Sequence, residues 1–100
     1  MTNKNQVSVS LLERVKEFIR VDGTYEDDVI NSLILAAIVE LEKSGVSRRS
    51  ESNDDYPLYE LAIKAIVSQN YEGRGIVEGE NIIQSLILKL KDYPAVSDNE

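Results

Sequence analysis

The sequence predicts an all-α protein: a small four-helix domain with a long loop between helices two and three. Hydrophobic residues recur at spacings of three and four in four segments, and the β-branched residues lie inside that period instead of alternating. One hundred residues provide one compact core. We therefore expect a single helical domain at residues 10–93, preceded by an N-terminal arm at 1–9 and followed by a flexible C-terminal tail at 94–100.

The first helix is expected to run from about Leu11 to Arg20. Ser10 and Glu13 have the spacing of a capping box, which satisfies backbone N–H groups at a helix start. One face carries the apolar residues Leu11, Leu12, Val15, Phe18 and Ile19. Gly23, after Asp22, is expected to break this helix.

The second helix should begin after a cap at Thr24 and end near Ser44, with Gly45 as a left-handed stop. Its main apolar stripe comprises Ile30, Leu33, Ile34, Ala37, Ile38 and Leu41. Four further apolar residues widen the stripe: Val29, Leu35, Ala36 and Val39. A stripe of this width exceeds what one neighbouring helix covers. The polar segment GVSRRSESNDD follows, and we expect an exposed loop there that is mobile or functional.

The third helix should start near Asp54 or Asp55, with Pro57 in its first turn, where a missing N–H costs no hydrogen bond. It is apolar on two stripes, one of Leu58, Leu61, Ala62, Ala65 and Ile66 and the other of Tyr59, Ile63, Val67 and Tyr71. A helix apolar over most of its circumference needs protein on several sides. It therefore belongs in the middle of a bundle or partly against another subunit, with Gly73 and Gly75 ending it.

The fourth helix is expected from near Asn81 to a stop at Pro94. Its apolar residues Ile82, Ile83, Leu86, Ile87 and Leu90 recur at helical spacing.

Composition argues against most enzyme chemistry. The chain has no Cys and no His, which excludes disulfides, Cys/His zinc sites and nucleophiles paired with His. A net charge of −7 argues against binding nucleic-acid phosphates, which requires clustered Lys and Arg. No apolar run approaches the roughly 18 residues of a membrane span. We predict a soluble intracellular protein that is not an enzyme and has no catalytic residues and no cofactor.

Two acidic clusters were weighed as metal sites. Glu26, Asp27 and Asp28, with Asp22 nearby, could supply oxygen ligands to Mg²⁺ or Ca²⁺. Their spacing is not that of an EF-hand loop, and acidic residues in a first turn are favoured by the helix dipole. The same helix-end explanation holds for the segment 53–55. We therefore predict no metal ligand in either cluster.

The candidate interface residues are Tyr56, Tyr59, Tyr71, Arg74, Arg48 and Arg49. Tyrosine combines a large apolar ring with one hydroxyl, a combination enriched where a partner buries a surface. The same residues also suit the edge of a bundle, with hydroxyls in water. Arg74 could bridge subunits or cap helix carbonyls. Arg48 and Arg49 lie in the predicted loop, which is either a solvated connector or a docking or modification segment.

The order of these segments resembles the small head-tail connector, or adaptor, proteins of tailed bacteriophages. The likeness covers about residues 8 to 92 and rests on VSLLERVKEFIRVD, YEDDVINSLILAAIVELEKSG, LYELAIKAIVSQNYEGR and IIQSLILKLK. Within these segments it depends on the Asp27-Asp28 helix entry, the Tyr71-Glu72-x-Arg74 exit and Gln84-Ser85-Leu86.

The resemblance implies a structural DNA-packaging connector. Such proteins form a ring of about twelve copies under the portal protein, extend the DNA channel and dock the stopper or tail-completion protein. It also implies that the last helix and tail contact the portal, and that exposed loops meet neighbouring subunits and the next ring. The expected location is the virion neck, with assembly in the bacterial host cytoplasm or from a prophage.

An acidic ring agrees with that role, because a wall that repels phosphate lets double-stranded DNA pass without specific binding. Two other hypotheses remain open at this point. One is an acidic helical regulatory or inhibitor protein that binds a basic partner. The other is a carboxylate metalloenzyme that uses Asp27 and Asp28, which the missing His and the helix-dipole explanation disfavour.

Overall fold

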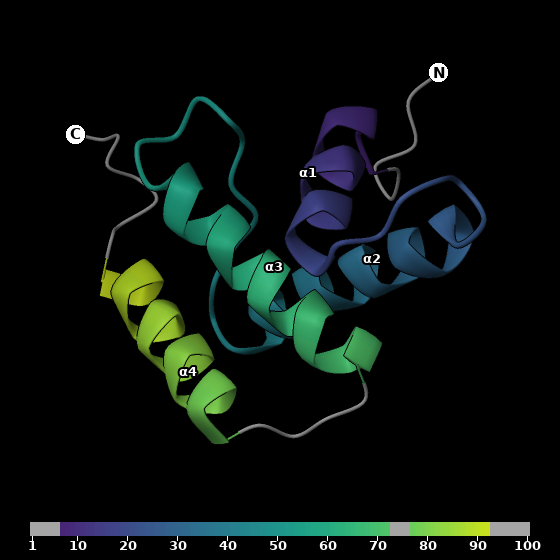
Figure 1. Cartoon of the computed structure of the whole chain (residues 1–100). Coiled ribbons are helices and arrows are strands. Elements are labelled where there is room, and N and C mark those ends of the chain that lie inside the picture. The colour runs from purple at the N-terminus through teal and green to yellow at the C-terminus, as the bar shows by residue number, and fades with distance from the viewer. Residues whose placement is uncertain (1–6, 73–76, 93–100) are drawn as a thin grey trace.

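The computed structural model describes residues 7–72 and 77–92, apart from the side chains of 77–81 and 92. Four helices occupy these residues: α1 (Val9–Ile19), α2 (Asp27–Lys43), α3 (Tyr56–Glu72) and α4 (Val77–Asp92) (Figure 1). No strand occurs in these two segments. The predicted all-α class with four helices is confirmed.

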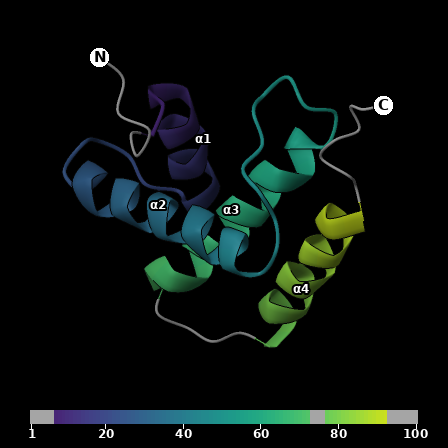
Figure 2. The same ribbon diagram turned by 180° about the vertical axis from the view of Figure 1, so that it is seen from behind.

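Helix α3 is the centre of the molecule. It packs against α1, α2 and α4, whereas α4 packs mainly against α3. Figures 1 and 2 show α4 at one edge, with α1 and most of α2 on the other side of α3. The molecule is flat, with extents of 45 × 40 × 20 Å, so its thin dimension is about two helix diameters. Of the two explanations expected for the apolar circumference of α3, the structure shows the middle of a bundle, because three helices surround it.

Helix α1 begins earlier than predicted. The Oγ atom of Ser8 accepts a hydrogen bond from the backbone N–H of Leu11 at 3.1 Å, so Ser8 is the cap and Ser10 lies inside the helix. The helix ends at Arg20, whose φ of 62° is left-handed. Its backbone N–H bonds to the carbonyls of Lys16 and Glu17. Both Ser8 and Ser10 carry a hydroxyl that can cap a helix. The capping-box spacing alone pointed to Ser10, which is not the cap.

Helix α2 also begins at a different residue. Its first residue is Asp27, because Thr24 forms a turn in which its carbonyl accepts from the Asp27 N–H at 3.2 Å. The predicted cap at Thr24 is therefore wrong. The predicted stop is right: Gly45 has a φ of 97°, a conformation that suits glycine.

The connection between α2 and α3, residues 44–55, is of modest length and well tied down. Val46 in it is only 1% exposed and belongs to the core. The Ser50 N–H donates to Oδ1 of Asn53 at 2.7 Å, and the Asn53 N–H donates to the carbonyl of Ser50 at 2.9 Å. The expected loop therefore lies between these two helices, but its length is modest, and it is not exposed throughout because a lone apolar residue such as Val46 has no period to reveal its burial.

The predicted start of α3 is correct, whereas that of α4 is not. Helix α3 starts at Tyr56 and places Pro57 in its first turn, as expected. Helix α4 starts at Val77, four residues before the predicted Asn81. The apolar period becomes visible only from Ile82, so the first turn of α4 carried no signal. The predicted stops at Gly73, Gly75 and Pro94 lie outside the described residues.

The core draws residues from all four helices and from Val46. Its largest fully buried side chains are Ile30, Ile34, Leu41, Ile63, Leu90, Val15, Val46 and Val67. Three residues assigned to buried stripes are instead exposed: Phe18 at 46%, Leu61 at 40% and Ile82 at 54%. Each of them lies at the edge of the buried face of its helix. The spacing of apolar residues alone does not show where that face ends. Leu33, Ile38, Leu58 and Ala65 pack against the core while only partly buried.

Candidate interaction surface

An ion network joins α1 to α3. The Arg14 guanidinium donates to both carboxylate oxygens of Glu60, from Nε at 2.7 Å and from Nη2 at 2.8 Å. Glu51 accepts from the same guanidinium at 3.2 Å, and Lys64 Nζ lies 3.2 Å from Glu60 Oε2. The hydrogen bonds from Arg14 are the main cause that lowers the pKa of Glu60 to about 2, and those to Glu60 raise the pKa of Arg14. These charges therefore satisfy one another.

Tyr56 lies beside this network and is half-buried. Burial is the main cause that raises its pKa to about 12, with a further contribution from a hydrogen bond to Glu60. Its ring centroid is 6.0 Å from that of Tyr59, with the two planes at 45°. Tyr59 itself is only 3% exposed, and its burial likewise raises its pKa. Of this predicted interface pair, only Tyr56 keeps area that a partner could cover.

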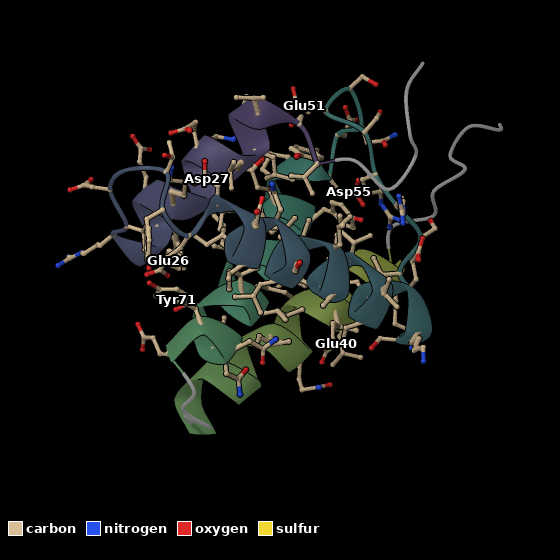
Figure 3. The ribbon with its side chains drawn as sticks, turned by 90° about the vertical axis from the view of Figure 1, so that its right-hand side faces the viewer. Glu26, Asp27, Glu40, Glu51, Asp55 and Tyr71 are labelled. Carbon is tan, nitrogen blue, oxygen red and sulfur yellow. The ribbon has the colours of Figure 1, made fainter. Side chains whose placement is uncertain are left out.

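The acidic start of α2 is held from two sides. Lys16 Nζ lies 2.8 Å from Oδ1 of Asp27 and donates to the carbonyl of Gly23, and the hydrogen bond to Asp27 raises the pKa of Lys16. The Tyr71 hydroxyl donates to Oε1 of Glu26 at 2.8 Å, which raises the pKa of Tyr71 (Figure 3). Two carboxylates weighed as metal ligands thus have protein partners. Among the described residues, no group of three or more His, Cys, Asp or Glu side chains could hold a metal ion.

Arg49 links three parts of the chain. Its Nε donates to Oδ2 of Asp55 at 2.9 Å, its Nη2 to the carbonyl of Leu90 at 3.0 Å, and its Nη1 to the carbonyl and Oγ of Ser47 at 2.6 and 2.9 Å. The side chains of Arg49 and Asp55 are 4% and 5% exposed. Arg49 therefore joins the connection to the start of α3 and the end of α4. Its role is internal, unlike that of Arg48, which pairs with Glu42 at 3.0 Å on the surface.

The outward face of α2 carries the apolar surface that the wide stripe predicted. Val29 is 55% exposed and Val39 is 43% exposed. Leu35, Ala36 and Val39 line a shallow surface depression of about 550 Å³, and polar or charged side chains from Glu40, Lys43 and Arg48 surround them. Exposed apolar residues rimmed by charge are typical of a surface that a partner covers. We call residues 29, 32, 35, 36 and 39 the α2 outer face.

A second apolar surface lies on α4. Leu88 is 62% exposed and Ile82 is 54% exposed, and Ser85 and Lys89 are exposed between and beside them. We call residues 82, 85, 88 and 89 the α4 outer face. Sequence reasoning missed this surface because it assigned Ile82 to the core and did not place Leu88. The signal was present, since Leu88 falls off the stripe formed by Ile83, Leu86, Ile87 and Leu90.

The predicted interface residues do not form one cluster. Tyr59 and Arg49 are buried in the molecule, Tyr56 lies at the α1–α3 ion network, and Tyr71 lies at the start of α2. Arg74 lies outside the described residues. None of the described helices has the length and apolar character that crossing a membrane requires.

Comparison with protein families identifies a family to which the chain is similar. The model of the family described as "Phage gp6-like head-tail connector protein" matches residues 9–92, which span all four helices. The searches of curated proteins and of solved structures returned no significant match.

Proposed function

The chain belongs to the phage gp6-like head-tail connector family, and from this membership we propose that it forms a ring under the portal protein. The family is structural, and its members belong to the neck of the virion. In our proposal a ring of about twelve copies extends the DNA channel and docks the stopper or tail-completion protein. Assembly takes place in the cytoplasm of the bacterial host. The protein catalyses no reaction and needs no cofactor.

The observation that carries the proposal is the family match over 9–92, together with apolar surface left uncovered on two helices. Val29 and Val39 on α2 and Ile82 and Leu88 on α4 are each more than two-fifths exposed. The described residues, which form a flat domain two helices thick, leave these side chains uncovered. Copies of the chain or other neck proteins would cover them.

The charge of the chain supports the proposed channel. Its net charge is −7, and a ring multiplies that charge around the axis. DNA phosphates are repelled by such a wall, which keeps double-stranded DNA from binding while it passes.

The decisive experiment combines the purified chain with its cognate portal and images the product by electron microscopy. We expect an added ring of density on the portal at a fixed stoichiometry. Portal alone is the control. Failure to associate under assembly conditions would refute the proposal. Salt-sensitive binding to a basic protein, without a ring, would support instead the acidic regulatory or inhibitor function.

A further inference from the structure

We infer that the α2 outer face of one copy packs against the α4 outer face of the next copy. This inference rests on the proposed function, because it names the surfaces by which the ring would close. It specifies a contact between two different faces of the same chain, repeated head to tail.

Within the described residues, no helix covers either face. Helix α4 packs mainly against α3, which leaves Leu88 62% exposed on the opposite side. Helix α2 packs against α1 and α3 through Ile30, Ile34, Ala37 and Leu41, which leaves Val29 and Val39 exposed. Figures 1 and 2 show α3 between α4 and most of α2, so the two faces are separate surfaces of one copy.

The two surfaces also differ in charge. The exposed charged residues of α2 are Asp28, Glu40, Glu42 and Lys43, and Arg48 pairs with Glu42 beside them, so this surface keeps a small net negative charge. Among the side chains described on α4, those of residues 82–91, the exposed charged residues are Lys89 and Lys91 and none is acidic. Pairing α2 with α4 brings opposite charges together. Pairing α4 with α4 would bring the lysines of residues 82–91 together, and pairing α2 with α2 would bring together two surfaces of the same net sign.

The two faces also share a pattern of small residues next to larger apolar ones. Ser32 and Ala36 lie one turn apart on α2, with Leu35 and Val39 beside them. On α4, Ser85 lies between Ile82 and Leu88. Small residues flanked by larger apolar ones allow two helices to approach closely and interlock.

The symmetry follows from the pairing. A contact between two unlike faces is heterologous, and repeating it produces either a closed ring or an open filament. A contact between like faces would instead stop at a dimer. The α2–α4 pairing is therefore the one that meets the geometric need of a connector ring.

The absence of cysteine in the natural chain allows a direct test by cross-linking. An untagged Ala36→Cys variant is mixed with a tagged Ser85→Cys variant and oxidised, with and without the cognate portal. Because a disulfide forms only when Cβ atoms approach within roughly 4.5 Å, we expect a mixed dimer that contains one tagged chain. Asn70→Cys, on an exposed position of α3 outside both faces, replaces Ala36→Cys as the matched control and should give none.

Charge exchange provides a second test that does not depend on disulfide geometry. Glu40→Lys and Lys89→Glu change exposed residues that take no part in the ion pairs of the described residues. We expect each single variant to lower the yield of oligomer on the portal about fivefold or more, and the double variant to restore it. Circular dichroism establishes that each variant is folded.

The outcomes separate this inference from the proposed function. Portal binding with the mixed cross-link supports both. Portal binding without it, or with only Ala36–Ala36 or Ser85–Ser85 dimers, overturns the pairing and leaves the connector function standing. The mixed cross-link without portal binding supports the pairing and counts against the connector function. If neither is seen, both are wrong.

Discussion

At the scale of single residues, two arginines hold this domain together in different ways. Arg14 bonds to Glu60 from a position 36% exposed, whereas Arg49 and Asp55 are both almost fully buried. An ion pair that water reaches contributes modestly, because water screens the charges. A buried ion pair adds little net stability, because both charges lose their water on folding. Removing one partner is costly, because the other charge then remains buried with neither a partner nor water. The two pairs therefore predict different mutational behaviour.

Glu60 makes stability depend on acid. The pKa of its carboxyl falls from 4.5 to about 2 in the folded protein, chiefly through its hydrogen bonds with Arg14. A lowered folded-state pKa contributes stability above about pH 4.5, and that contribution is lost as the pH falls toward 2. We expect Glu60→Gln to remove on the order of 2 kcal/mol at pH 7, after allowance for the solvent around Arg14, and to flatten the unfolding free energy between pH 4.5 and 2.

Urea titrations across this pH range measure that effect. Glu17→Gln is the matched control, since Glu17 is exposed and has no ion pair among the described residues. An identical acid profile for wild type and Glu60→Gln would show that Arg14 does not perturb Glu60 in solution.

The buried pair of Arg49 and Asp55 predicts strong coupling. Asp55→Ala leaves the Arg49 charge buried and unpaired, and we expect it to cost about 3 to 5 kcal/mol. Replacing both, as Arg49→Met with Asp55→Leu, should cost much less than the sum of the single changes. Thermal unfolding of the single and double variants measures the coupling. Additive losses would contradict the buried-pair interpretation.

At the scale of helices, the apolar residues of α3 differ sharply in what they contact. Tyr59, Ala62, Ile63, Ile66 and Val67 are buried among the other helices, whereas Leu61 is 40% exposed beside Lys64 and Pro57. The two apolar stripes of α3 predicted protein on several sides of this helix, from the same bundle or from another subunit. They could not show which margin of the stripes faces water, since Leu61 fits the helical period as well as Ala62 does.

This difference predicts the cost of truncation. Ile34→Ala removes a fully buried side chain of α2 and should cost about 2 to 5 kcal/mol. Leu61→Ala should cost less, about 1 kcal/mol, because two-fifths of Leu61 is already exposed to water. Guanidinium unfolding compares the two variants. Equal losses of stability in the two variants would show that Leu61 is buried in solution, contrary to this structure.

Helix starts were the least predictable feature of the elements. The start of α1 depends on which of two chemically similar serine hydroxyls accepts the first N–H groups, whereas the Glu26 cap of α2 makes no side-chain hydrogen bond to the helix. Glu26 illustrates the difficulty, because its carboxylate accepts from Tyr71, a residue distant in the sequence. That contact exists only once α3 packs across the end of α2. Tertiary structure therefore decided what local rules left open.

At the scale of the whole molecule, charge predicts how the protein treats DNA. With a net charge of −7 and phosphates repelled, we expect no binding of double-stranded DNA down to low salt. Fluorescence anisotropy of a labelled duplex measures this, with the chain free and assembled on its portal. Binding that weakens as salt rises would reveal a basic channel surface and would contradict the proposed smooth conduit.

The class, the helix number and the wide α2 stripe could all be predicted from the sequence, because each depends on periodicity. The structure separates the candidate interface residues by burial, which composition alone does not show. Tyr59 and Arg49 have the composition of interface residues, yet their burial comes from the packing of α3 and α4 in the same chain. The outer faces became visible only once the structure showed which sides of α2 and α4 remain uncovered.

The three-way attachment of Arg49 has a thermodynamic consequence for whatever meets the segment between α2 and α3. Since these bonds already hold this segment in place, a partner would not have to order it, and the entropy lost on association would be small. Calorimetry of a partner that binds this segment should therefore give a heat-capacity change that is explained by the buried contact area alone. The extra term that accompanies folding upon binding would be absent.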